Sequence, residues 1–312
     1  MSGDDPQVLA ARDVIVAARA DVLLLLDMDH DVGLAALQAL AGALAEAGLD
    51  YPHRFAAAPN TGRPTGIDLD GDGRSYRARD AQGYGLFRGD GGMALLSRHP
   101  VGAVRDFTDL PWVALPEASA AEVTPPEALD VLALHSVGAW DVEILAPGGP
   151  VHLLGSHASP PVFDGPEDRN GRRNADELRF WTLYLDGWTP GGAPFTAARF
   201  AVAGTFNVDP SRGEGRRDSL RALLGHPALR DAVPAGASGS PATADWQDPW
   251  PGDLRVDYIL PSRTMRVLAS GVLWPSDGGT LMGVSPATAA AASDHRLVWM
   301  DLSLADGATT RP

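Results

Sequence analysis

The fold is decided by the stretch Asp21-Val-Leu-Leu-Leu-Leu26, which is followed at once by Asp27-Met-Asp29-His-Asp31. An uninterrupted apolar run of this length predicts a buried strand. Before it, Asp5-Pro6 predicts the N-cap and first residue of a helix that ends near Arg19 and leads directly into the strand. The carboxylates after the strand have two interpretations, a solvated acidic turn or functional groups at a strand end.

The rest of the chain mixes strands and helices without strict alternation. A second helix is predicted over Gly33–Gly48, and two more near Asn174–Asp186 and Arg217–Leu224. Strands are predicted at Gly92–Ser97, Asp141–Leu145, Val151–Ser156, Arg199–Thr205, Arg255–Leu260, Met265–Trp274 and Leu297–Leu302. This pattern predicts an α+β fold in which two sheets pack together with helices outside. The sequence has no clear internal boundary, so we expect one domain over residues 1–312.

The composition of the 312-residue chain excludes several kinds of catalytic chemistry. All 25 basic residues are Arg, so lysine Schiff-base and Walker-type chemistry is excluded. Cysteine is absent, which excludes disulfides, thiolate nucleophiles and Cys-bound metals. With 40 acidic residues the net charge is −15, which disfavours coating of nucleic acid or anionic membrane. The remaining catalytic groups are His, carboxylates, amides, hydroxyls, Arg and any metal that they hold.

Three further segments bring polar side chains to strand ends. His157 leaves a strand into the Pro160-Pro161 loop, and Asn207 follows the small-residue run Val202-Ala-Gly-Thr205. Ser293-Asp294-His295-Arg296 precedes the last strand, and Asp257 lies in the strand before it. A single His of this kind is structural more often than catalytic. The order of the four segments along the chain is what makes them specific.

That order resembles the endonuclease/exonuclease/phosphatase superfamily, the metal-dependent phosphoesterases with a DNase I-like fold. The resemblance extends from Asp4 to Leu302. It is similar to a bacterial phytase-like branch through the runs Asn60–Gly73, Gly92–Ser97 and Asp164–Asn174. The resemblance implies a four-layer α/β/β/α sandwich.

The resemblance also implies roles for individual residues. Asp27 and Asp294 correspond to the metal carboxylates, which would hold Mg²⁺, or Mn²⁺ or Ca²⁺ in its place, through oxygen ligands. The catalytic positions would be His157 and His295 at phosphoryl oxygens, Asn207 positioning water or substrate, and Asp257 orienting His295.

The sequence departs from the family pattern at three points. Thr205 stands where the family has the Asp that acts as general base, and a hydroxyl accepts a proton poorly near neutral pH. Asp27 is one methylene shorter than the family's Glu. The family also begins with a strand ending in an Asn that contacts the metal, and this chain starts after that strand would have ended, either because its start is assigned too far downstream or because the strand and its ligand are lost. These departures predict reduced activity.

Two further groups of side chains have open interpretations. The loop Asp68-Leu-Asp70-Gly-Asp72-Gly resembles the first half of a calcium loop, but Arg79 stands where a Glu would close it. It is either a second cation site or a plain Asp/Gly turn. Arg169 and Arg173, within an Arg-rich helix start, either form a solvated face or contact substrate phosphate.

Together these patterns predict a metal-dependent phosphoesterase that acts on a small phosphorylated compound rather than on nucleic acid. The alternative is a catalytically degenerate protein that binds phosphorylated ligands, and a glycosidase with paired carboxylates is a distant third. No signal peptide or membrane span is visible. An N-terminus placed too far downstream would hide a signal peptide, so localisation stays open, as does the oligomeric state.

Overall fold

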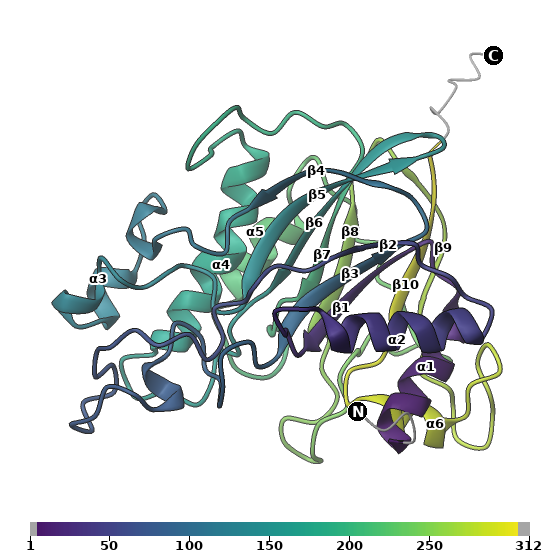
Figure 1. The fold of residues 1–312 in the computed structure, drawn as a ribbon, viewed down its shortest axis with the longest axis horizontal. Helices are drawn as coiled ribbons and strands as arrows, with labels where there is room; N and C mark the ends of the chain where they lie inside the picture. The colour runs from purple at the N-terminus through teal and green to yellow at the C-terminus, as the bar shows by residue number, and fades with distance from the viewer. Residues whose placement is uncertain (1–4, 305–312) are drawn as a thin grey trace.

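The computed structural model describes residues 5–304 and contains two facing layers of sheet with helices on both outer sides (Figure 1). The helices are α1 (Pro6–Ala18), α2 (Ala35–Glu46), α3 (Ala120–Val123), α4 (Arg169–Leu185), α5 (Arg217–Leu224) and α6 (Pro286–Ala292), with short 3₁₀ turns at Ala78–Asp80, Trp112–Ala114 and Pro126–Ala128. The strands are β1 (Val22–Met28), β2 (His53–Phe55), β3 (Gly92–Ser97), β4 (Val101–Asp106), β5 (Gly138–Ala146), β6 (Gly149–His157), β7 (Phe200–Thr205), β8 (Asp257–Pro261), β9 (Arg266–Val272) and β10 (Val298–Ser303).

The strands form three hydrogen-bonded groups. The first sheet layer contains a three-stranded sheet of order β1-β3-β2 and a separate pair, β10-β9. The second layer is a five-stranded sheet of order β4-β5-β6-β7-β8. Its β6 and β7 are parallel and its other neighbours are antiparallel.

Three apolar clusters hold the layers together. Ile15 of α1 and Leu44 of α2 pack with Leu96 on the outer face of the first layer. Met93 and Trp140 belong to the cluster between the two layers. The largest cluster packs α4 and α5 against the outer face of the five-stranded sheet. The predicted α/β/β/α sandwich is therefore confirmed.

Local signals explain how the first elements begin. Asp5 caps α1 by accepting from the amides of Gln7 at 2.8 Å and Val8 at 3.3 Å, with Pro6 at the first helical position as predicted. Asp31 accepts from three amides at the start of α2, including Ala35 at 2.8 Å. The last carboxylate after β1 is therefore a helix cap.

No helix among residues 5–304 is long and apolar enough to cross a membrane.

Some elements differ from the prediction. α4 begins at Arg169 rather than near Asn174, because its first turn is polar and has no apolar periodicity. β2, β4, α3 and α6 were not predicted from the sequence. β2 has only three residues and α3 only four, β4 is half exposed, and α6 is mostly Ala, so none of them carries a periodic apolar pattern.

The burial of β1 also differs from the prediction. Only Leu23 of this apolar strand is buried, and its other leucines are half-buried. In the described part of the chain β1 pairs with β3 alone, and β10 pairs with β9 alone. The edge of β1 that does not pair with β3 faces a cavity, which is why an apolar strand in the middle of the fold remains accessible.

Candidate active site

Three neighbouring strands of the second layer bring polar side chains into one row. His157 at the end of β6 is in register with Thr205 at the end of β7, and Thr205 is in register with Asp257 at the start of β8. Residues in register on paired strands point to the same face of a sheet. The row therefore lies on the face that is turned toward the first layer.

Gly204 permits this close arrangement. Its φ is +150°, and a Cβ at this position would stand 1.8 Å from the carbonyl oxygen of Ser156 on the neighbouring strand. A larger residue would push β7 away from β6. The glycine before Thr205 is thus required by the approach of the two backbones.

Asp257 is the centre of the hydrogen-bond network in the row. It accepts from the hydroxyl of Thr205, and its carboxylate lies 2.9 Å from Nδ1 of His295. Its own amide donates to Oγ1 of Thr243 at 3.0 Å. Burial alone would lower the pKa of His295, but the hydrogen bond and charge of Asp257, with the charges of Asp27 and Asp294, raise it. The ring of Trp246 packs edge-on against His295, 5.1 Å between centroids.

His157 lies at the other end of the row from Asp257, and Asn207 follows Thr205 by two residues. Nδ1 of His157 is buried and has no hydrogen-bond partner among the described residues. Burial lowers the pKa of His157, against the raising effect of Asp27. Asn207 takes a left-handed backbone, φ +57°, and donates from Nδ2 to the carbonyl of Ala158 at 2.8 Å. This bond fixes the amide next to the loop that follows His157.

A β-bulge orients Asp27. The register of β1 against β3 shifts between Leu26 and Met28, so Asp27 has no partner residue and takes φ +59°. Gly91 makes room for it, since a Cβ there would stand 2.5 Å from Oδ1 of Asp27. Asp29 accepts from the amide of Gly91 at 3.0 Å. Of the three carboxylates Asp27, Asp29 and Asp31, Asp27 alone lines the cavity of the site.

These side chains line one cavity of about 800 Å³: Asp27, His157, Thr205, Asn207, Asp257 and His295. The structure thus brings together six of the predicted site residues from both sheet layers. Asp294 lies beside them but is exposed and is not part of the lining. Sequence reasoning missed Thr243 and Trp246, which sit in an irregular loop without any motif.

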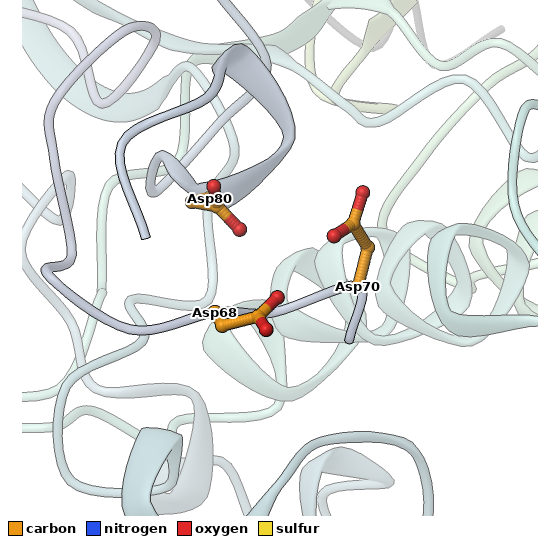
Figure 2. A group of neighbouring side chains, drawn as sticks. All are labelled: Asp68, Asp70 and Asp80. Atoms are coloured by element: carbon orange, nitrogen blue, oxygen red, sulfur yellow. The ribbon is translucent and has the colours of Figure 1, made fainter. Parts of the chain in front are cut away.

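The acidic loop after Ile67 is a separate feature (Figure 2). Ligand atoms of Asp68, Asp70 and Asp80 lie within 4.8 Å of one another, and Asp72 is not part of this group. Both oxygens of Asp68 accept from loop amides, including Gly73 at 2.7 Å, and buried Asp80 accepts from the amides of Leu69 and Arg77. These bonds are those of an Asp/Gly turn, and the third carboxylate of the group is Asp80 rather than the predicted Asp72.

Arg173 does not have the predicted position of a phosphate ligand. It is buried, and its guanidinium donates to the carbonyls of Leu134 at 2.9 Å, Gln82 at 2.6 Å and Ala133 at 2.8 Å. Burial lowers the pKa of Arg173 to about 10, so it stays charged at neutral pH. All of its nitrogens are used to hold loops. Arg169 donates to the carbonyl of Leu69 at 2.9 Å and so supports the acidic loop.

The oxygen ligands at the cavity suit only one kind of metal site. Asp257 is already bonded to Thr205 and His295, whereas Asp27, which lines the same cavity, is bonded to neither of them. Among residues 5–304, no three His or carboxylate ligand atoms converge here. This donor set does not enclose a cation, but it fits Mg²⁺ held by one or two carboxylates together with water and phosphate.

The chain was compared with known proteins. A model of the Endonuclease/Exonuclease/phosphatase family matches residues 1–295. The solved structure of an endonuclease/exonuclease/phosphatase from Beutenbergia cavernae is similar, with 20% identity, a TM-score of 0.61, and coverage of 96% of this chain and 66% of that chain. This chain therefore spans slightly less than two thirds of that relative.

Two more solved structures have a similar fold. A family protein from Leptotrichia buccalis has 16% identity and a TM-score of 0.55, over 96% of this chain and 93% of that chain. The human Nocturnin catalytic domain, solved with a bound sulfate anion, has 19% identity and a TM-score of 0.52, over 96% and 87%. The comparison with curated proteins gave no match. Because the family model covers nearly the whole sequence, the chain belongs to the endonuclease/exonuclease/phosphatase family.

Proposed function

We propose that this protein is a divalent-metal-dependent phosphoesterase that hydrolyses a phosphomonoester or phosphodiester of a small molecule. The observation that carries the proposal is the row of His157, Thr205 and Asp257 on three paired strands, with His295 bonded to Asp257 and Asp27 facing the same cavity. Two histidines and the amide of Asn207 can donate to the negative charge that a phosphoryl transition state gathers, and the two carboxylates, Asp27 and Asp257, can hold a cation and orient His295.

Each side chain has a defined task in this proposal. Asp27, with Asp294 beside it, would hold Mg²⁺ or a similar ion, which neutralises phosphate charge when bound. His157 and His295 donate hydrogen bonds to phosphoryl oxygens, and Asp257 fixes the ring of His295 through Nδ1. Asn207, held by its bond to Ala158, positions the attacking water or a substrate oxygen.

Thr205 has a positioning role in this proposal. Its hydroxyl donates to Asp257, so it supplies no carboxylate base, and we expect turnover to be lower by roughly 10²–10⁴ than with such a base. Thr205→Val removes the bond with little change of shape, and Thr205→Ser keeps it. We expect kcat to fall about tenfold in the Val variant and to recover in the Ser variant. Equal kcat in all three proteins would contradict the role.

Charge and motifs narrow the substrate class. A net charge of −15 repels polyanions, which favours small phosphorylated compounds over nucleic acid. The runs Asn60–Gly73 and Asp164–Asn174 are the grounds for a phytase-like branch within the family. An affinity for DNA that is useful at physiological salt and falls steeply as salt increases would reverse this preference.

Turnover of p-nitrophenyl phosphate and bis-p-nitrophenyl phosphate with Mg²⁺, Mn²⁺ or Ca²⁺ tests the proposed activity. We expect metal-dependent hydrolysis that falls by at least about tenfold in Asp27→Asn and His295→Ala. Asp218→Asn is the matched control, because Asp218 is fully exposed on α5, away from the cavity. Hydrolysis that is unchanged in Asp27→Asn and His295→Ala would refute the assignment of the site.

A non-catalytic phosphate-binding protein is the second candidate. It is favoured by Thr205, whose hydroxyl is engaged with Asp257 where the family has a base. Inorganic phosphate binding measured by calorimetry, lost in His295→Ala and accompanied by no turnover with any of the three metals, would select this alternative.

A further inference from the structure

The two loops that follow β6 and β7 are held together by one side chain of α4. Asn174 is fully buried, and its Nδ2 donates to the carbonyl of Ser159 at 2.6 Å and to the carbonyl of Phe206 at 2.8 Å. Ser159 lies two residues after His157, and Phe206 lies one residue before Asn207. A single amide nitrogen therefore ties the segment after one candidate site residue to the segment before the other.

The bond to Phe206 acts directly on the backbone of Asn207. The carbonyl of Phe206 belongs to the peptide group that supplies the backbone nitrogen of Asn207, and a peptide group is planar. Holding this carbonyl therefore fixes the plane from which the backbone of Asn207 continues. That backbone is left-handed, with φ +57°, a region that residues with a side chain seldom occupy unless their surroundings hold them there.

The bond to Ser159 acts on the side chain of Asn207. Nδ2 of Asn207 donates to the carbonyl of Ala158 at 2.8 Å. The next residue, Ser159, accepts from Asn174 at its carbonyl and donates from its amide to Glu177 at 2.6 Å. Asn174 therefore fixes the segment that accepts from the side chain of Asn207 as well as the peptide group before Asn207.

The other polar atom of the Asn174 side chain gains nothing from this arrangement. Its Oδ1 is buried and has no hydrogen-bond partner among the described residues. A buried acceptor without a partner costs about as much stability as two hydrogen bonds to carbonyl groups contribute. The side chain of Asn174 therefore adds little net stability through its polar atoms, whereas it constrains two loops at the candidate site.

We propose that Asn174 is a positioning residue, which sets the orientation of the Asn207 side chain at the cavity by holding the carbonyls of Ser159 and Phe206. Asn174 lies on α4 and is not part of the cavity lining, so it acts through Asn207 and not on the substrate. Its effect on turnover rests on the proposed function, whereas its effect on the Asn207 side chain does not.

The first test observes the Asn207 side chain directly. The NMR signals of its side-chain amide are assigned from the spectrum of Asn207→Asp, and the hydrogen exchange of this amide is then measured. Asn174→Asp keeps the shape of the side chain but replaces the donor by an acceptor, and Asn174→Ala removes the donor without adding charge. We expect the Asn207 side-chain amide to exchange at least about tenfold faster in both variants.

The matched control for both tests is Thr182→Val. Thr182 lies on the same helix, and its Oγ1 is buried without a hydrogen-bond partner among the described residues. Valine has nearly the same shape, so this change alters a buried side chain of α4 but breaks no hydrogen bond. We expect the parent's exchange at Asn207 and the parent's kcat in this variant.

The second test asks whether turnover depends on Asn174 through Asn207. On bis-p-nitrophenyl phosphate we expect the kcat of Asn174→Ala to fall at least about tenfold, with KM within about twofold of the parent's. In an Asn207→Ala background the same change should alter kcat by less than about twofold, because residues that act through one contact are not additive. A general structural defect would lower kcat by the same factor in both backgrounds.

Two outcomes overturn the proposal. The first is exchange of the Asn207 side-chain amide that stays within about twofold of the parent's in both Asn174 variants. The second is a kcat of Asn174→Ala that equals the parent's, or that falls by the same factor with and without the Asn207 side chain. A parent protein without any turnover contradicts the proposed function instead, and the exchange measurement then decides the positioning role alone.

Discussion

Replacement of Glu177 is the most direct test of how α4 supports the candidate site. Its side chain is 1% exposed and accepts from the amide of Ser136 at 2.7 Å, the hydroxyl of Ser136 at 2.9 Å and the amide of Ser159 at 2.6 Å. Arg173, one turn earlier on α4, binds three carbonyls of neighbouring loops. The two charges thus clamp the segment after His157 and the segment before β5.

Glu177→Gln keeps the size of the side chain but puts an amide donor against groups that also donate, and it leaves Arg173 without its nearby negative charge. Hydrogen bonds to a charged group contribute about 1.5–3 kcal/mol, and we expect a loss of this size. For a chain of this length that corresponds to a drop in Tm of roughly 2–5 °C.

Urea unfolding followed by tryptophan fluorescence, together with calorimetry, measures the effect of Glu177→Gln. Glu122→Gln is the matched control, since Glu122 is 62% exposed in its pair with Arg172, and we expect a change within about 0.5 kcal/mol. A Glu177→Gln protein within about 1 kcal/mol of the parent would show that the carboxylate charge contributes little and would refute the clamp.

Three further predictions follow from single contacts. Gly204→Ala lowers the Tm and abolishes any turnover, because the new Cβ meets the carbonyl of Ser156; wild-type turnover in this variant would contradict the row geometry. Asp231 is partly buried, which favours protonation, but two bonds from Arg255 hold its pKa below the ordinary value near 4. Its stabilisation is therefore complete above about pH 4 and is lost as the pH falls through the lowered value, so unfolding free energies of Asp231→Asn vary less than those of the parent below about pH 4. Calorimetric titration with Ca²⁺ should give the same heat for the parent and Asp70→Ala, because loop amides already satisfy the neighbouring carboxylates; a loss of heat in the variant would establish a cation site.

The sequence predicted the site where the signal is local. Buried apolar runs mark the strands, and the polar residue that ends a run marks the edge of the sheet, so His157 and Thr205 could be identified one by one. Asp257 lies inside the predicted strand Arg255–Leu260, and its role was implied by the family resemblance. The register that makes them neighbours depends on pairing between distant segments. The cluster of three carboxylates in the acidic loop also depends on contact between distant residues. Asp80 joins Asp68 and Asp70 only after the loop folds back.

The role of Arg173 could not be predicted for a related reason. An Arg at a helix start has the same local sequence whether it faces solvent, phosphate or carbonyl groups. The choice is made by the loops that pack on α4, and these contribute the carbonyls of Gln82, Ala133 and Leu134 from another part of the chain. The apolar run of β1 is the opposite case. Its composition predicts full burial, and its observed exposure results from the cavity beside it.

The structure also changes the interpretation of the role of Thr205. From the sequence it is a lost base, but Thr205 stands directly opposite Asp257 on a paired strand and donates to it. A carboxylate at position 205 would put two like charges in register, an arrangement that is destabilising unless a proton or cation lies between them. Threonine removes that repulsion and with it part of the negative charge that would attract a metal. The hydroxyl at position 205 therefore leaves Asp257 as the one carboxylate of the row, so a cation at this end of the cavity has less negative charge to balance.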